Sequence, residues 1–161
     1  MVEEQFLDPT RHDRQAFTSG VSELDEYLHR FAAQQSKKGV AVVRVLVDTD
    51  APSVILGYYS LSAAQIDVSQ LDQASKKKLP RYPVPCFRMG RLAAHSAHHG
   101  RGLGRILVGC AVERCLDAKK QVAAYALLVD VKGEKAKEFY EHYGFIPCTD
   151  NPMTLYLPLG D

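Results

Sequence analysis

The chain has 161 residues, of which 46% are hydrophobic, 24% charged and 9% aromatic. This length favours one domain spanning residues 1–161, and this composition excludes intrinsic disorder, collagen-like repeats and a small disulfide-bonded scaffold. The net charge of +1 hides an asymmetry, because residues 76–120 contain eleven Lys/Arg against two acidic residues. Such a basic block is typical of a surface that binds a polyanion, although acidic neighbours in the fold could equally balance it.

Helix and strand patterns alternate through the first half of the chain. Apolar residues at helical spacing predict a helix over residues 20–35. Two stretches rich in β-branched and aromatic residues, 40–47 and 54–66, flank a turn signal and predict a hairpin. A loop rich in lysine and proline is expected over 67–85, leading into a strand over 84–95.

The second half predicts two helices and two further strands. Residues 102–119 carry an apolar stripe that indicates an amphipathic helix, and its start is crowded with glycine. A strand over 122–131 follows, and then a helix that ends at Gly144, where a left-handed C-terminal cap is expected. A last strand over 154–159 completes an α+β, mixed α/β arrangement without internal repeats.

The cysteines and the N-terminus indicate the compartment. The four cysteines form no CxxC pair and have no histidine partners at zinc-ligand spacing. The N-terminus lacks the basic and apolar segments of a secretion signal, and no apolar run reaches the length of a membrane span. We therefore expect reduced thiols, a cytoplasmic protein and no metal ion.

The most informative segment is a glycine-alternating turn between an expected strand and an expected helix. It reads His99-Gly100-Arg101-Gly102-Leu103-Gly104-Arg105. Glycines let a phosphate approach the main chain closely, and the unpaired amides and dipole of a helix N-terminus favour a pyrophosphate. The Rossmann and P-loop fingerprints fail, because the third glycine of GxGxxG is missing and no Lys-Ser or Lys-Thr pair is present. A flexible glycine loop before a core helix is the alternative.

This turn resembles the acetyl-CoA signature Gln/Arg-x-x-Gly-x-Gly/Ala of the GNAT N-acetyltransferase superfamily, with His99 in place of the first residue. A second family element, Ala-x-x-Phe-Tyr-x-x-x-Gly-Phe, is matched by Ala136, Phe139, Tyr140, Gly144 and Phe145. The resemblance implies a GNAT fold, with a mostly antiparallel twisted sheet flanked by helices. It also implies acetyl-CoA as cosubstrate, held by Leu92, Ala93, Ala94, His99, Gly100, Arg101, Gly102, Leu103, Gly104 and Arg105.

Over about residues 17–146 the chain is similar to the GNAT toxins of bacterial type II toxin–antitoxin modules, the TacT and AtaT kind. Besides the glycine turn, the matching stretches are Phe17-x-x-Gly20-x-x-x-Leu24-Asp25-x-Tyr27-Leu28, Gly57-Tyr58-Tyr59-Ser60-Leu61-Ser62, Arg91-Leu92-Ala93, Leu128-Val129-Asp130 and Phe139-Tyr140. This resemblance implies an aminoacyl-tRNA acceptor and a small ribbon-helix-helix antitoxin as partner, and it is compatible with a homodimer.

The resemblance also assigns a catalytic role to Tyr140. Direct acyl transfer requires a neutral amine, a donor for the oxyanion and a proton for the departing thiolate. By resemblance, the Tyr140 hydroxyl faces the sulfur of CoA and is the general acid, while backbone groups of residues 92–94 hold the thioester arm. The alternative is that Tyr140 only packs, on the same apolar stripe as Ala136 and Tyr143.

The expected strand before the turn contains no carboxylate between residues 84 and 94, where many lysine-acetylating GNAT enzymes place a glutamate base. Deprotonating a lysine amine near neutral pH costs about 4 kcal/mol, whereas an α-amine with a pKa of about 7.7 costs a few tenths. The sequence therefore favours an α-amine acceptor. The nearest titratable groups are His95, His98 and His99, a cluster more typical of a solvent-facing surface than of a proton relay.

These observations predict an acetyl-CoA-dependent N-acetyltransferase, a toxin that acetylates the α-amine of aminoacyl-tRNA and blocks translation. The basic patch expected to contact tRNA consists of Lys76, Lys77, Lys78, Arg81 and Arg88. Two alternatives stay open: a GNAT enzyme that acetylates a protein N-terminus or a small-molecule amine, and a non-catalytic acyl-CoA-binding regulatory module. The basic block disfavours a polyamine or aminoglycoside substrate, because such a cation requires an acidic site.

Overall fold

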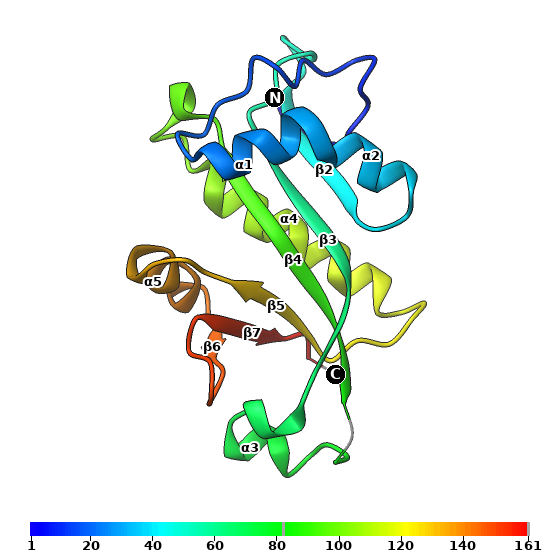
Figure 1. Cartoon of the computed structure of the whole chain (residues 1–161), viewed down its shortest axis with the longest axis vertical. Helices are drawn as coiled ribbons and strands as arrows, with labels where there is room; N and C mark the ends of the chain where they lie inside the picture. The colour runs from blue at the N-terminus through cyan, green and yellow to red at the C-terminus, as the bar shows by residue number, and fades with distance from the viewer. Residues whose placement is uncertain (82, 161) are drawn as a thin grey trace. The chain divides into compact units, whose positions relative to one another are not determined.

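The computed structural model describes residues 1–81 and 83–160 (Figure 1). Its strands are β1 (Val2–Phe6), β2 (Val42–Asp48), β3 (Gly57–Ile66), β4 (Val84–Ala94), β5 (Ala126–Asp130), β6 (Ile146–Pro147) and β7 (Thr154–Pro158). Within the described residues the strand order is β1-β2-β3-β4-β5-β7-β6. β4 pairs with β5 in parallel, whereas β1–β2, β2–β3, β5–β7 and β6–β7 are antiparallel, so the expected mostly antiparallel sheet is confirmed.

The chain divides into two compact units. The first comprises residues 1–62 and 90–111, and the second comprises residues 63–89 and 112–161. Three elements are divided between the two units: β3 after residue 62, β4 before residue 90, and the long helix α4 (Leu103–Ala118) after residue 111. Each unit has its own cluster of buried apolar side chains.

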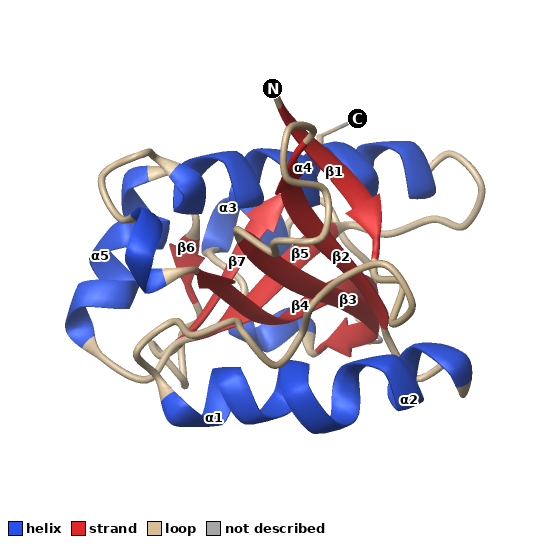
Figure 2. Ribbon diagram, turned by 90° about the horizontal axis from the view of Figure 1, so that it is seen from above, coloured by secondary structure: helices blue, strands red, loops and turns tan. Residues whose placement is uncertain are grey.

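In the first unit, the expected hairpin is confirmed as β2 and β3. The expected helix over 20–35 is also present, but it consists of α1 (Ser22–Glu26), a π-helical turn (Tyr27–Phe31) and α2 (Ala32–Lys37). Figure 2 shows α1 and α2 along one face of the strands, with α4 on the opposite face. Between the first two helices and the strands lies a buried cluster that includes Phe17, Tyr27, Leu28, Tyr58 and Ala93.

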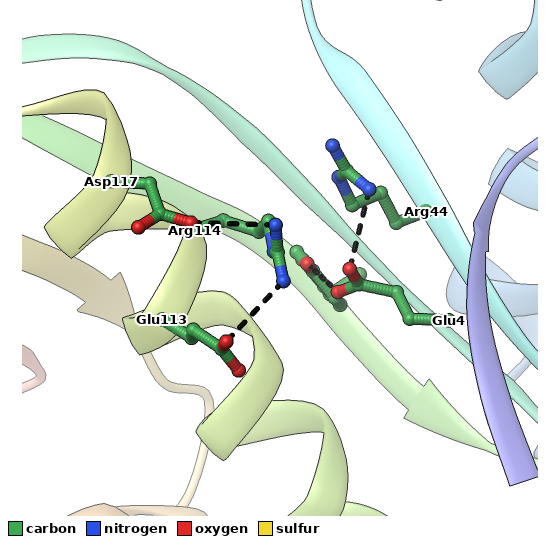
Figure 3. Close-up of polar contacts among 6 residues, drawn as sticks. Glu4, Arg44, Glu113, Arg114 and Asp117 are labelled. Atoms are coloured by element: carbon green, nitrogen blue, oxygen red, sulfur yellow. Dashed lines mark hydrogen bonds and ion pairs between the residues drawn. The ribbon is translucent and has the colours of Figure 1, made fainter. Parts of the chain in front are cut away.

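Strand β1 was not expected from the sequence, because two adjacent glutamates interrupt its apolar pattern. It pairs with β2 so that Glu4 lies opposite Leu46. The Glu4 carboxylate accepts a hydrogen bond from Arg44 Nη1 at 3.2 Å and another from the Tyr59 hydroxyl (Figure 3). An ion pair and a phenol thus satisfy a largely buried carboxylate, and these long-range contacts are invisible in the local pattern.

Helix α4 confirms the amphipathic pattern expected over 102–119. Leu107 and Ala111 are fully buried. A Cβ atom at Gly57 of β3 would lie 2.8 Å from Leu107 Cδ1 and 3.0 Å from the Ala93 carbonyl oxygen. A side chain here would displace the Leu107 side chain and crowd a backbone oxygen, so glycine at position 57 allows the start of α4 to pack tightly on the strands.

The second unit corrects two expectations about its boundaries. The strand expected over 122–131 begins only at Ala126, since Val122 is exposed in the loop before it. The loop expected over 67–85 contains a short 3₁₀ turn (Val68–Gln70) and the helix α3 (Gln73–Lys76). The core of this unit is a cluster formed by Ile66, Leu71, Val84, Cys86, Ala126, Leu128, Cys148 and Tyr156.

Helix α5 (Glu134–His142) is the second C-terminal helix expected from the sequence. Gly144 follows it with a φ of +93°, which confirms the left-handed cap. The expected apolar stripe is narrower than predicted, because Ala136 is exposed and Tyr143 is only half-buried, while Tyr140 is buried. The four cysteines are free thiols, as expected. No helix among the described residues is long and apolar enough to cross a membrane.

Candidate functional site

The glycine turn lies between the end of β4 and the start of α4, and it requires glycine at two positions. After the 3₁₀ turn Ser96–His98, Gly100 has a φ of +88° and Gly102 a φ of +70°. A Cβ atom at Gly100 would contact nothing within 4 Å, and one at Gly102 would meet only Arg105 Nη2 at 4.0 Å. The left-handed backbone, rather than crowding, therefore selects glycine here.

The first turn of α4 presents main-chain amides suited to an anion. Ile106 N–H donates to the Gly102 carbonyl at 3.2 Å, which is the first hydrogen bond of the helix. The amides of residues 103–105 precede it and have no partner within the helix. Leu103 is buried and anchors the turn, whereas Gly102 is exposed. A negatively charged group placed here gains both amide donors and the favourable end of a 16-residue helix dipole.

The two arginines of the turn differ in whether a carboxylate lies near the guanidinium. Arg101 Nη2 lies 3.9 Å from Asp48 Oδ2, and its Nη1 lies 3.3 Å from His98 Nδ1. Arg105 is exposed and pairs with no carboxylate among the described residues. Of the two, Arg105 is therefore the cation available to an anionic ligand, while the charge of Arg101 is partly balanced by Asp48.

The end of β4 combines buried side chains with a fixed backbone. Ala93 is 4% exposed, and Leu92 and Ala94 are half-buried. The next residue, His95, donates its backbone N–H to the Leu56 carbonyl at 2.8 Å, which ties the strand end to the segment before β3. The backbone of residues 92–94 is thus held in the extended conformation of β4, a few residues before the glycine turn.

Two of the three histidines near the turn have their Nδ1 lone pairs engaged. His95 Nδ1 accepts a hydrogen bond from the Ala97 amide at 3.1 Å. His98 Nδ1 faces the Arg101 guanidinium, which can only donate. In the neutral form both rings therefore carry their proton on Nε2 and have no free lone pair for an amine proton. His99 is exposed. This arrangement favours the interpretation of the cluster as structural.

Tyr140 belongs to the second unit. It lies near the C-terminal end of α5, is 8% exposed, and its ring contacts Phe139 and Phe145 at centroid distances of 5.1 and 5.2 Å. No hydrogen-bond partner of its hydroxyl is found among the described residues. Burial raises the pKa of Tyr140 above its ordinary value. The hydroxyl therefore stays protonated near neutral pH and is available as a donor.

The residues expected to form a basic patch are arranged around α3 and along β4 in the second unit. Lys77, Lys78 and Arg81 are exposed, and Lys76 is half-buried. Arg88 is different, because it forms an ion pair with Asp130, which also accepts a hydrogen bond from the Thr154 hydroxyl at 2.7 Å. The three exposed cations are thus the available part of the patch, and the charge of Arg88 is already compensated.

Sequence reasoning missed two contacts made by Arg91 of β4. Ser60 is 3% exposed, and its Oγ accepts a hydrogen bond from the Arg91 amide at 3.1 Å. The guanidinium carbon of Arg91 lies 3.8 Å from the centroid of the buried Tyr27 ring. Tyr27, Ser60 and Arg91 belong to the stretches that resemble the toxins, but no local pattern indicates that they meet.

Comparisons with known proteins agree with this architecture. The model of the acetyltransferase (GNAT) domain family matches residues 31–147. The tRNA-acetylating toxin of Mycobacterium tuberculosis strain H37Rv is 30% identical, over 92% of this chain and 87% of that protein. A structure of AtaT in complex with acetyl-methionyl-tRNAfMet superposes with a TM-score of 0.92 and 27% identity, over 98% of this chain and 95% of that one.

A second solved structure adds further ligands. It is a tyrosine-to-phenylalanine variant of the AtaT toxin bound to the C-terminus of the antitoxin AtaR and to acetyl-CoA. Its TM-score is 0.83 at 26% identity, and the match covers 98% of this chain and 93% of that one. Since the family model spans more than half of the chain and the fold agrees over nearly all of it, the chain belongs to the GNAT acetyltransferase family.

Proposed function

We propose that residues 1–161 act as one GNAT domain, a toxin that transfers the acetyl group of acetyl-CoA to the α-amine of an aminoacyl-tRNA and so blocks translation. One observation carries this proposal. The chain is similar over more than nine-tenths of its length to a tRNA-acetylating toxin and to AtaT, whose structure contains an acetylated aminoacyl-tRNA. A general GNAT enzyme would share the cofactor turn but would not need to match these proteins from end to end.

The glycine turn fits the pyrophosphate of acetyl-CoA. The amides of residues 103–105 and the α4 dipole suit two adjacent phosphates, and the left-handed Gly100 and Gly102 keep side chains away from them. Arg105 adds a charge that no carboxylate of the described residues neutralises. The cosubstrate supplies the activated thioester, while the extended backbone of residues 92–94 orients its carbonyl. His99 has no required role, because main-chain amides provide the contacts.

Tyr140 is the general acid of this proposal. Its raised pKa keeps the hydroxyl protonated, and the hydroxyl is not occupied by another described residue. Expulsion of CoA creates a thiolate whose conjugate acid has a pKa near that of a cysteine thiol, about 8.5. The phenol gives its proton to that sulfur as the bond between the acetyl carbon and the sulfur breaks, and the proton lost by the acetylated amine returns the phenolate to its neutral form.

The acceptor is an amine that needs no strong base. β4 carries no carboxylate, and the lone pairs of His95 and His98 at Nδ1 are engaged. An α-amine with a pKa of about 7.7 is substantially neutral near physiological pH, and an adjacent ester lowers its basicity further. An aminoacyl-tRNA presents such an amine, whereas a lysine side chain does not.

The partners follow from the same proposal. Lys76, Lys77, Lys78 and Arg81, with a smaller contribution from Arg88, contact phosphates of the tRNA outside the acceptor end. The relative AtaT is bound to its antitoxin in a solved structure, which supports an antitoxin as partner. In this proposal the antitoxin is of the ribbon-helix-helix type, and the active form is a cytoplasmic protein that can form a homodimer.

An acceptor comparison tests the proposed function. The full chain is incubated with labelled acetyl-CoA and, in parallel, with aminoacyl-tRNA, deacylated tRNA, a peptide with a free N-terminus and an aminoglycoside. We expect label only in the aminoacyl-tRNA, in a product whose amine no longer reacts with amine reagents. Label in the peptide or the aminoglycoside alone would overturn the tRNA proposal, and binding of acetyl-CoA without transfer to any acceptor would favour a regulatory module.

A further inference from the structure

Arg91 presents a positive charge immediately before the part of β4 assigned to the thioester. Its side chain is exposed, and it forms no ion pair among the described residues. Arg30, Arg44 and Arg101 of the same unit each lie within 4 Å of a carboxylate, from Glu26, Glu4 and Asp48 respectively. The charge of Arg91 is therefore available to an external anion in a way that theirs is not.

One contact directs the side chain of Arg91, and a second holds its backbone. The guanidinium carbon lies 3.8 Å from the centroid of the Tyr27 ring, and the Arg91 amide donates to Ser60 Oγ at 3.1 Å. A guanidinium stacked on an aromatic face keeps its N–H groups at the edge of the plane free to donate. The cation is thus oriented before any ligand arrives.

The ring beneath Arg91 is itself immobilised. Tyr27 is 3% exposed, stacks on Tyr58 at a centroid distance of 6.2 Å, and donates its hydroxyl to Gln35 Oε1 at 2.8 Å. The Tyr58 hydroxyl donates to the Leu24 carbonyl at 2.6 Å. Because the Tyr27 ring is held in place, the Arg91 side chain loses little conformational entropy when an anion binds to it. Preorganisation of this kind raises affinity.

We propose that Arg91 binds a backbone phosphate of the acceptor RNA close to its aminoacylated 3′ end and thereby positions the α-amine for transfer. The inference rests on the proposed function, since it assumes a nucleic-acid acceptor. A planar guanidinium can contact two oxygens of one phosphate, which an ammonium cannot match in geometry. Arg91 adjoins Leu92 in sequence, so its contact lies at the reacting end of the RNA rather than in the basic patch around α3.

Binding of deacylated tRNA by the full chain, measured over a series of salt concentrations, tests this assignment. Arg91→Met keeps an apolar side chain over Tyr27 and removes the charge. We expect the slope of log affinity against log salt to fall by about 0.7 to 0.9 in magnitude, the change that accompanies one phosphate no longer neutralised by the protein. Arg91→Lys should retain the slope while binding more weakly. Acetyl-CoA affinity should be unchanged in both variants.

Arg30→Met is the matched control, because Arg30 also lies over an aromatic ring, that of Phe31 at 5.5 Å, but is paired with Glu26. It changes the net charge equally and should leave the slope unaltered. A folded Arg91→Met protein with the slope of the parent would overturn the inference, as would an equal decrease in Arg30→Met. Loss of RNA binding by the parent would overturn both proposals, whereas RNA binding without acetylation would contradict only the proposed function.

Discussion

The backbone N–H of Phe145 donates to the carbonyl of Tyr140 at 3.1 Å, and the two rings meet edge to face at 5.2 Å. Together with the Gly144 amide, which donates to Glu141 at 3.0 Å, this is the Schellman arrangement with its accompanying hydrophobic contact. The end of α5 therefore fixes both the backbone and the ring of Tyr140. Gly144 and Phe145, the Gly-Phe pair of the family pattern, thus form the helix cap that positions Tyr140, the proposed general acid.

Gly144→Ala should lower the free energy of unfolding by about 1 to 2 kcal/mol, because alanine is strained at the φ of +93°. Its Cβ would meet only Leu157 Cδ1 at 3.7 Å, so no clash contributes. Urea denaturation measures the change. Gly109→Ala is the control with opposite sign, since this exposed residue within α4 should gain about 0.5 to 1 kcal/mol. Equal stability of Gly144→Ala and the parent would contradict the cap.

Gly102→Glu should abolish acetyl-CoA binding, measured by calorimetry. The substitution places a negative charge beside the amides that would face the pyrophosphate, and it strains a left-handed residue. Gly39→Glu is a matched control, because Gly39 has a φ of +75° with open space around it. It should lose similar stability and keep full affinity. Tight binding by folded Gly102→Glu protein would place the cofactor elsewhere.

Replacement of Lys77, Lys78 and Arg81 by glutamine should weaken tRNA binding and reduce its salt dependence, by about 0.7 to 0.9 in the log–log slope for each phosphate that the variant no longer neutralises. Arg88→Gln should change the slope less than any one of these, because Asp130 already neutralises Arg88. Acetyl-CoA affinity serves as the control and should stay constant. An unaltered slope in the triple variant would exclude α3 and its flank from the RNA surface.

Stability should decrease as the pH falls below 7, in part through His12. This residue is buried, its Nδ1 accepts from the Asp8 amide at 2.9 Å, and burial lowers its pKa below the ordinary value of 6.5. The unfolded chain then binds a proton that the folded chain resists, so unfolding is favoured by at most about 1.4 kcal/mol per pH unit in that range. Urea denaturation of His12→Asn between pH 7 and 5 should show a shallower dependence.

The exposed His142 provides the control for that series. His142→Asn should keep the pH dependence of the parent, because it removes a histidine from the surface and leaves the buried ring of His12 in place. If His12→Asn retained the full dependence of the parent, the buried ring would not be its source.

The sequence predicted the elements whose apolar residues recur locally. The stripe that includes Leu107 and Ala111 indicated α4, and Gly144 marked the end of α5, because the spacing of the pattern and the cap chemistry lie within a few residues. Strand β1 was missed because Glu4 is accommodated by Arg44 and Tyr59, which are about 40 and 55 residues away. The start of β5 was placed too early, since apolar residues such as Val122 are not all buried.

In the candidate site, too, local features could be predicted from the sequence and long-range contacts could not. The glycine turn was recognisable because left-handed positions select glycine directly. Arg88 and Arg101 form ion pairs, so their charges are partly neutralised and less available to a ligand. These ion pairs were not predictable, because the partners Asp130 and Asp48 lie far away in sequence. The contact of Arg91 with Tyr27 is of the same kind. Charge counts in a sequence locate basic segments, but only the fold shows which charges are neutralised.

Tyr140→Phe should reduce turnover by about 10² to 10⁴, the typical contribution of a positioned general acid, with little change in acetyl-CoA affinity. The variant keeps the ring that contacts Phe145 and removes one hydroxyl. Tyr143→Phe is the matched control on the same helix and should stay active. Near-parent turnover of a folded Tyr140→Phe protein would remove Tyr140 from the chemistry and leave it a packing residue.

Mass spectrometry of the aminoacyl-adenosine released from aminoacyl-tRNA, after incubation with acetyl-CoA and the full chain, detects the proposed transfer itself. We expect a mass increase of one acetyl group on the α-amine with the parent and with Tyr143→Phe, and a strongly slowed increase with Tyr140→Phe. An unmodified aminoacyl group with the active parent, accompanied by acetylation of a peptide or a small-molecule amine under the same conditions, would exclude aminoacyl-tRNA as the acceptor.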